Sequence, residues 1–259
     1  MSVRSLLDLS SKVALVTGGS RGIGLQMASA LGEMGARVAL AARKQDELDA
    51  ARAQLEVQGI ECLAVAGDLS DAASIASAVD AVLGAWKQID IVVNNAGTNW
   101  AAPAEDYPDE GWRKVLDLNV DAAFFLSREV ARRSMIPRRS GKIVNIASIA
   151  GLLGNPPDWG MYTVAYNTSK GALVQMTRAL AAEWGKHNIN VNAICPGFFP
   201  SKMTKVTLDR ITESVLALTP LQRLGGDEDL KGSVVYLASE ASRHVTGQVI
   251  AVYGGCTVI

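Results

Sequence analysis

The chain has little of several residue types, and each shortage argues against a class of protein. Its 259 residues include three cysteines, two histidines and 5% aromatic residues, and the formal net charge is −1. Cys62, Cys195 and Cys256 lie far apart and match no metal or redox spacing, so we expect free thiols in a reducing cytosol and no metal site. The nearly balanced charge argues against a nucleic-acid or acidic-membrane partner.

Long apolar segments are also lacking. The sequence has no run of about 18 apolar residues, and its first twelve residues, MSVRSLLDLSSK, lack the apolar core of a signal peptide. We therefore expect a cytoplasmic protein without a membrane segment. Hydrophobic residues make up 49% of the chain and charged residues 20%, which is typical of a globular protein with a large core.

Seven short apolar or β-branched segments are present, and they alternate with longer helical patterns. Most of them are continuously apolar, as in strands that are buried on both faces of a parallel sheet. No linker interrupts the alternation, which predicts one α/β domain over 1–259, a doubly wound Rossmann-type fold with a seven-stranded parallel sheet flanked by helices. We expect a dinucleotide-binding half at about 1–147 and a catalytic and substrate-binding half at about 148–259. The predicted strands are 12–17, 37–41, 61–66, 89–95, 141–148, 189–195 and 247–253.

A glycine-rich segment, VTGGSRGIG at 16–24, follows the first predicted strand and opens the first predicted helix. Gly18, Gly22 and Gly24 allow a tight turn and a close approach of the backbone to a pyrophosphate. The helix N-terminus then offers free N–H groups and a positive dipole to phosphate. A glycine-rich loop alone is weak evidence, but the strand–turn–helix context indicates a dinucleotide site.

The residues at the end of the second predicted strand, ALAARK, indicate whether the protein prefers NAD or NADP. An NAD site needs an acid about 20 residues beyond the glycine loop for the ribose 2′-OH, whereas this chain has Ala42 followed by Arg43. Arg21 in the glycine loop adds a second cation, and two guanidinium groups can bind a 2′-phosphate. With no acid expected nearby, we predict a preference for NADP(H) over NAD(H). The alternative is that Arg43 is only a solvated residue at a helix start.

Two further strand ends carry candidate cofactor contacts. Asp68, in AGDLS, is placed either to bind an adenine amino group or to cap the next helix together with Ser70 or Asp71. The segment NNAG at 94–97 consists of small residues that let the backbone lie against a flat cofactor.

Tyr166 and Lys170 are spaced i, i+4 and therefore share one face of a helix. Free tyrosine has a pKa of about 10, so acid–base work near pH 7 requires about 4 kcal/mol of phenolate stabilisation. A lysine ammonium at about 4 Å supplies about that much at an effective dielectric constant near 20. Ser148, which ends the fifth predicted strand, is placed to hydrogen-bond a substrate carbonyl or alkoxide. By itself, such a tyrosine–lysine pair is more often an ordinary helix surface.

The other motifs of the chain support a catalytic interpretation of this tyrosine–lysine pair. Over essentially its whole length the chain resembles the short-chain dehydrogenase/reductase family, especially 3-oxoacyl-acyl-carrier-protein reductases and gluconate 5-dehydrogenases. The order and the spacing of six motifs carry the resemblance. These motifs are TGGSRGIG at 17–24, NNAG at 94–97, Asn119 in LDLNV, Ser148, YNTSK at 166–170 and PG at 196–197.

The resemblance implies hydride transfer between a nicotinamide and a carbonyl or alcohol carbon. It makes Tyr166 the acid–base group, Ser148 the holder of the carbonyl, Lys170 the group that tunes Tyr166 and binds the nicotinamide ribose, and Asn119 the ligand of a relay water. Together the motifs and the resemblance yield a list of expected cofactor contacts. It comprises Gly18, Ser20, Arg21, Gly22, Ile23, Gly24, Arg43, Asp68, Leu69, Asn95, Ala96, Gly97, Tyr166, Lys170, Pro196, Gly197, Phe199 and Ser201.

The chain departs from the family pattern at three places. Ser201 stands where threonine is usual, Tyr253 in VYGG replaces an acid, and Ser148 and Tyr166 are farther apart than usual. The extra residues fall in 154–165, beside the expected substrate, where Asp158 either binds a substrate hydroxyl or is solvated. Lys202 and Lys205 either attract an anionic substrate or form a solvated face. The expected apolar pocket residues are Trp100, Trp159, Met161, Tyr162, Phe198 and Met203.

The sequence therefore predicts an NADP(H)-dependent carbonyl reductase, reversibly an alcohol dehydrogenase, similar to 3-oxoacyl reductases. Two alternatives remain open, a polyol or sugar-acid dehydrogenase of the gluconate 5-dehydrogenase kind and a catalytically idle NADP-binding regulator. The resemblance also implies a homotetramer joined through the helices of Asn119 and Tyr166 and through the last strand. The apolar segment at 172–184 fits such an interface or simply packs on the sheet.

Overall fold

The computed structural model describes residues 1–258 and contains one parallel sheet with the strand order β3-β2-β1-β4-β5-β6-β7. The predicted fold class is confirmed, and each of the seven predicted strands is found, most of them slightly shorter than predicted. The central strands are completely buried, which explains their continuous apolar sequences. The strands are β1 (Val13–Thr17), β2 (Arg37–Ala42), β3 (Cys62–Ala66), β4 (Ile91–Asn94), β5 (Gly141–Ile146), β6 (Ile189–Pro196) and β7 (Val249–Val252).

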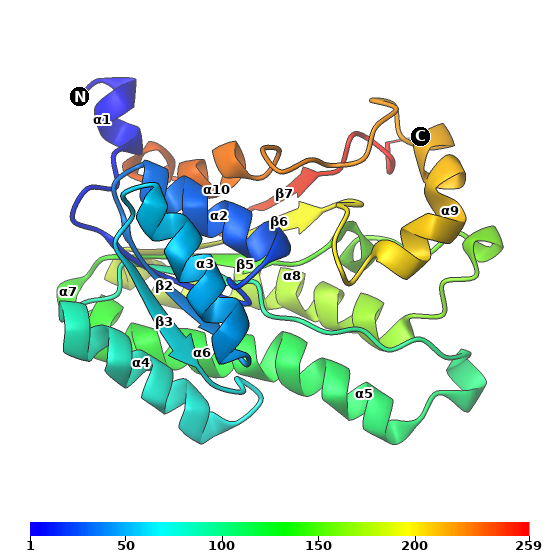
Figure 1. The fold of residues 1–259 in the computed structure, drawn as a ribbon, viewed down its shortest axis with the longest axis horizontal. Coiled ribbons are helices and arrows are strands. Elements are labelled where there is room, and N and C mark those ends of the chain that lie inside the picture. Colours follow the sequence, from blue (N-terminus) through cyan, green and yellow to red (C-terminus); the bar gives the residue numbers. More distant parts are fainter. Residues whose placement is uncertain (259) are drawn as a thin grey trace.

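Helices cover both faces of the sheet (Figure 1). Side chains of α2, α3 and α10 form one core with the sheet, and those of α4, α6 and α8 form the core on its other face. Each of these six helices turns apolar residues toward the sheet, as the three-to-four spacing of such residues predicts. The helices are α1 (Val3–Leu7), α2 (Gly22–Glu33), α3 (Gln45–Val57), α4 (Ala72–Trp86), α5 (Asp109–Leu116), α6 (Ala122–Val130), α7 (Ile136–Arg138), α8 (Val164–Trp184), α9 (Lys205–Ala217) and α10 (Lys231–Ala238).

The strand order reverses between β1 and β4, which in doubly wound sheets opens a crevice beyond the carboxyl ends of the strands. Asn95 spans this crevice, since its side-chain amide donates to the carbonyl oxygens of Thr17 at 2.9 Å and Gly18 at 3.1 Å. The hydroxyl of Thr17 in turn accepts from the backbone N–H groups of Asn95 and Ala96, each at 2.9 Å. The glycine loop and the NNAG segment are thereby held as one unit.

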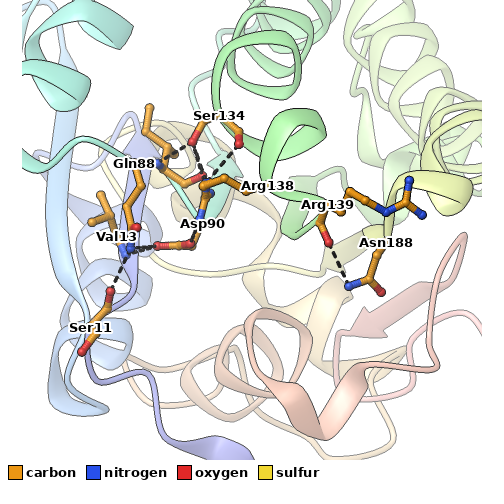
Figure 2. A network of polar contacts seen from close by, with 9 residues as sticks. Ser11, Val13, Gln88, Asp90, Ser134, Arg138, Arg139 and Asn188 are labelled. Atoms are coloured by element: carbon orange, nitrogen blue, oxygen red, sulfur yellow. Dashed lines mark hydrogen bonds and ion pairs between the residues drawn. The ribbon is translucent and has the colours of Figure 1, made fainter.

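A polar network lies at the amino ends of the central strands β1 and β4, opposite the crevice (Figure 2). The carboxylate of Asp90, just before β4, accepts from the backbone N–H of Val13 at 2.9 Å and from Arg138 Nη1 at 2.6 Å. Ser134 exchanges hydrogen bonds with the backbone of Ile89 in the same region. The network therefore supports the fold and is remote from the crevice.

Two findings concern membrane-spanning helices and metal-binding groups. None of the helices within residues 1–258 combines the length and the apolar character needed to cross a membrane. In the same part of the chain, no group of three or more histidine, cysteine or acidic residues is placed to hold a metal ion.

Candidate active site

A cavity of about 440 Å³ lies at the carboxyl ends of the strands, running from the glycine loop to the tyrosine–lysine pair. It collects residues from most of the motifs found in the sequence. The expected residues that border it are Gly18, Ser20, Arg21, Gly22, Ile23, Gly24, Arg43, Leu69, Asn95, Ala96, Gly97, Ser148, Tyr166, Lys170, Pro196, Gly197, Phe199, Ser201 and Met203. Lys44, Glu47, Leu118, Ile146 and Lys202 border it as well.

The glycine loop fits a dinucleotide. Gly18 and Gly22 have positive φ angles of 60° and 55°, which glycine adopts without strain. A Cβ on Gly24 would lie 2.3 Å from the carbonyl oxygen of Gly18, so only glycine permits this packing of helix against loop. Arg21, the N-cap of α2, makes no side-chain cap hydrogen bond to the first N–H groups of the helix within residues 1–258, and Gly22, Ile23 and Gly24 of this first turn border the cavity. A bound pyrophosphate would satisfy such donors.

The wall at the end of β2 differs from the prediction, because an acid lies among its cations. Arg21 Nη1 is 2.9 Å from Glu47 Oε1, and Lys44 Nζ is 3.2 Å from the same oxygen. The sequence-based expectation that no acid lies nearby was therefore wrong. Glu47 stands in the first turn of α3, and the packing of α3 on the sheet brings it to the glycine loop 26 residues earlier.

Asp68 is occupied by its own turn. Its carboxylate accepts from Ser70 N at 3.0 Å and from Ser70 Oγ at 2.7 Å, and these bonds, with a smaller effect from Arg43, lower the pKa of Asp68. The cap of α4 is Asp71, which accepts from Ser74 N at 2.9 Å. Within the described residues Asp68 does not border the cavity, so its geometry is that of a turn residue.

Asn119 lies in a π-helical turn, Asp117–Asp121, between α5 and α6. Its Oδ1 accepts from Thr98 N at 2.8 Å, and its Nδ2 donates to Thr98 O at 3.0 Å and to Ser169 Oγ at 2.9 Å. Turns of this kind are frequent at functional sites because they redirect a side chain that a regular helix would place elsewhere. Asn119 thus links the end of β4 to α8, the helix that carries Tyr166. Asn119 does not itself border the cavity within the described residues.

The three predicted catalytic side chains meet on one wall of the cavity. Ser148 lies two residues beyond the end of β5, rather than in the strand as predicted, and its hydroxyl accepts from Ala150 N at 3.1 Å. Tyr166 and Lys170 come from the first two turns of α8, with Lys170 Nζ 5.5 Å from the centre of the Tyr166 ring. Lys170 Nζ donates to the carbonyl oxygen of Ile146 at 2.8 Å, a partner that no sequence motif indicates.

Burial dominates the electrostatics of this wall. It raises the pKa of Tyr166, while the hydrogen bond with Ser148 acts in the opposite direction. Burial lowers the pKa of Lys170 to about 8, because the residue is only 4% exposed and its ammonium has lost most of its hydration. Without a cofactor, the protein therefore moves the pKa of Tyr166 farther above neutral pH. The expectation from the sequence, which considered only the charge of a nearby lysine, had the opposite direction. Strongly perturbed groups that face one cavity are typical of catalytic sites.

The insert at 154–165 packs on α9 instead of entering the cavity. The rings of Trp159 and Phe198 meet edge to face with their centres 5.6 Å apart. Arg210 on α9 donates from Nη2 to the carbonyl oxygens of Trp159 at 3.1 Å and Gly160 at 3.2 Å. These contacts join the insert to α9 and to Phe198, the residue before Phe199, which borders the cavity. Sequence reasoning missed Arg210 because its partners are backbone atoms about 50 residues away.

The expected apolar pocket residues are divided among several places. Among the described residues that border the large cavity, only Met203 comes from that set. Trp100 packs its ring against Gly111 of α5, and Tyr162 is 58% exposed. Phe198 borders a separate cavity of about 170 Å³ together with Phe199 and Tyr253. Tyr253, the residue in place of the usual acid, contacts Gly197, where an added Cβ would lie 2.7 Å from the Cβ of Tyr253.

Comparison with known proteins agrees with this geometry. A family model described as enoyl-(acyl carrier protein) reductase matches residues 18–257. The gluconate 5-dehydrogenase of Gluconobacter oxydans (strain 621H) is 39% identical over 260 residues, covering 100% of this chain and 99% of that protein. A 3-oxoacyl-[acyl-carrier-protein] reductase of rhamnolipid biosynthesis from Pseudomonas aeruginosa is 39% identical, covering 96% of this chain and 97% of that protein.

The fold is shared with a solved structure as well. A gluconate 5-dehydrogenase from Burkholderia cenocepacia J2315, solved in complex with NADP and tartrate, superposes with a TM-score of 0.93. It is 31% identical, and the alignment covers 100% of both chains.

Proposed function

The chain belongs to the short-chain dehydrogenase/reductase family, whose members are oxidoreductases that act on carbonyl and alcohol groups. From this premise we propose that the protein is an NADP(H)-dependent ketone reductase, which in the reverse direction is a secondary-alcohol dehydrogenase. The observation that carries the proposal is the meeting of Ser148, Tyr166 and Lys170 on one wall of the cavity that begins at the glycine loop. Arg21 and Arg43 on the same cavity support NADP(H) in preference to NAD(H).

The cofactor would lie along the glycine loop and the end of β4, and when bound it supplies the hydride or accepts it. The chain's own groups do the rest. Ser148 donates a hydrogen bond to the substrate oxygen and orients the carbonyl. Tyr166 then donates its phenolic proton to that oxygen in reduction and removes it in oxidation. Lys170, held by the carbonyl of Ile146, provides the positive charge beside the phenol.

Asn119 acts through position in this scheme. Its side chain joins Thr98 to Ser169, three residues from Tyr166 in α8, and so fixes the helix relative to the end of β4. The water that the family resemblance assigns to it would extend the proton path from Lys170 toward solvent. The proposal for Asn119 is therefore a positioning and relay role.

We expect carbonyl reduction to lose activity as the pH rises through about 8. The pKa of Lys170 is lowered to about 8, so its ammonium is charged below that pH and loses its proton above it. The raised pKa of Tyr166 keeps the phenol protonated over the same range, so Lys170 is the group that limits reduction. The kcat/KM for a ketone measured from pH 5.5 to 10 should be level below about 7 and decline above 8. A profile that stays level to pH 10 contradicts this assignment.

Two substrate classes fit the cavity. The apolar wall at Phe199 and Met203 favours an oxoacyl chain, as in the 3-oxoacyl reductase relative. Lys202 on the same wall favours a substrate carboxylate, as in a sugar acid of the kind that the gluconate 5-dehydrogenase relatives handle. NADPH oxidation should be measured against 3-oxoacyl esters, keto-sugar acids and aryl ketones. Turnover with none of these classes would contradict the proposed function.

A catalytically idle NADP-binding regulator is the rival class. The presence of all four residues, Asn119, Ser148, Tyr166 and Lys170, in one connected site argues against it. An idle regulator would bind NADPH and show no turnover with any substrate class. A purely structural protein would not bind NADPH at all, which a fluorescence titration tests directly.

The assembly and the location are part of the proposal. We propose a homotetramer in the cytosol, joined through the helical segments that carry Asn119 and Tyr166 and through the last strand, β7. Exposed apolar side chains next to the start of α8, at Leu152, Leu153 and Val164, support such contacts. The three free thiols suit a reducing compartment. A monomer in light scattering would contradict the assembly, and recovery of the native protein outside the cytosol would contradict the location.

Replacing Arg210 with glutamine should raise the KM for the ketone roughly three- to tenfold and change kcat less. The substitution removes the two hydrogen bonds that join α9 to the insert, so we expect the insert and α9 to lose their fixed positions beside the cavity. Arg52→Gln, on the distant α3, is the matched control and should leave both constants unchanged. Equal KM values for the two variants would show that substrate binding does not depend on Arg210.

A further inference from the structure

Glu47 is the one acid on the cavity wall that Arg21, Arg43 and Lys44 form within the described residues. Its carboxylate contacts Arg21 across 26 residues and Lys44 within its own helix start. Other acids of α3 pair locally, as Asp49 and Glu56 do with Arg52 on the same helix. The side chain of Glu47 is 24% exposed, whereas that of Glu56 is 56% exposed. Glu47 is therefore part of the cavity wall and differs in this from the surface acids of the same helix.

We propose that Glu47 determines how strongly this protein prefers NADP(H) over NAD(H), a proposal that rests on the proposed function. Its negative charge offsets part of the cationic wall that attracts a 2′-phosphate, and its oxygens offer an acceptor to the 2′-hydroxyl of NAD(H). The protein then binds both cofactors, with the preference for NADP(H) held below what two arginines and a lysine would otherwise give.

Charge balance supports this direction. A phosphate monoester carries about −1.5 to −2 charges near neutral pH and makes strong bonds with guanidinium groups. In this wall, however, Arg21 Nη1 already donates a hydrogen bond to Glu47. Arg43 also interacts electrostatically with the carboxylate of Asp68. A 2′-phosphate must therefore compete with the carboxylate for Arg21 and lie close to a like charge. A 2′-hydroxyl does neither, and it donates a hydrogen bond to a carboxylate.

The binding of each cofactor, measured without any carbonyl substrate, separates this proposal from the proposed function. NADPH and NADH are titrated by fluorescence into the wild type, Glu47→Gln and the matched control Glu56→Gln, which lies on the same helix away from the cavity. For Glu47→Gln we expect the Kd of NADPH to fall and the Kd of NADH to rise. The ratio of the two should shift by about tenfold, equivalent to about 1.4 kcal/mol. Glu56→Gln should keep the wild-type ratio.

Glu47→Asp provides a second variant, since it keeps the charge and should leave the ratio within about twofold to threefold of the wild type. A ratio unchanged in Glu47→Gln would overturn the proposal, as would a weaker binding of NADPH, which would mean that Glu47 holds Arg21 in place for the phosphate. Failure of the wild type to bind either cofactor would instead overturn the proposed function. The three results are distinct.

Discussion

Phenylalanine in place of Tyr166 should lower the kcat/KM of carbonyl reduction by a factor of about 10² to 10⁴. The substitution removes only the phenolic oxygen, which is the group that transfers the proton to the substrate. The ring keeps its position at the start of α8, so neither the fold nor the glycine loop is disturbed. NADPH should bind to the variant with a Kd within about twofold of the wild type.

Tyr162→Phe is the matched control for this experiment. Tyr162 lies in the insert four residues earlier and is 58% exposed, so loss of its hydroxyl should leave turnover unchanged. Retention of wild-type turnover by Tyr166→Phe would exclude Tyr166 as the acid–base group. Loss of NADPH binding in parallel with turnover would mean that the hydroxyl serves cofactor binding and not proton transfer. The expected outcome is loss of turnover alone.

Features carried by short contiguous segments were predictable from the sequence. The strands were, because a buried parallel strand leaves a continuous apolar run such as VALVT or IVVN. The glycine loop and the tyrosine–lysine pair were as well, because their geometry depends on spacing within one turn or helix. Nineteen of the expected residues border the same cavity. Their roles in chemistry remain the subject of the experiments above.

Features that depend on how distant elements pack could not be predicted. Glu47 reaches Arg21 only after α3 has packed on β2, and Arg210 reaches Trp159 only after α9 has folded over the insert. Trp100 points at Gly111 because α5 passes beside it and leaves room for a large ring. The direction of the pKa change at Tyr166 was missed for the same reason. Burial by neighbouring elements raises the pKa of Tyr166, whereas the spacing of the motif indicates only one nearby charge.

The network at the amino edge of the sheet is another product of packing, and its centre is Asp90. Its side chain is 6% exposed and joins three elements, namely β1 through Val13, α7 through Arg138, and its own segment through Gln88 Nε2 at 2.9 Å. Figure 2 shows these groups converging on the carboxylate, apart from the pair formed by Arg139 and Asn188. No residue of this group borders the cavity within the described part of the chain.

Replacing Asp90 with alanine should therefore lower the free energy of unfolding by about 3 kcal/mol without impairing catalysis by the folded protein. The buried N–H of Val13 and the guanidinium of Arg138 would both lose their partner, and the loss of a buried pair's partner costs about 3 to 5 kcal/mol. The 32% exposure of Arg138 places the effect at the lower end. Thermal unfolding at one protein concentration should show a Tm lower by about 6 to 12 °C.

Asp80→Ala tests whether burial is the cause, because Asp80 forms the same kind of pair with Arg133 but is 64% exposed. Removal of such a surface pair should cost less than about 1 kcal/mol. Asp90→Asn, which keeps the size and one acceptor oxygen, should fall between the two and provides a folded sample if the alanine variant is too unstable. Equal losses for Asp80→Ala and Asp90→Ala would show that the network adds nothing beyond an ordinary surface ion pair. Unchanged turnover of Asp90→Asn at a temperature where it is folded would place the effect in stability, since the carboxylate lies at the edge of the sheet opposite the catalytic wall.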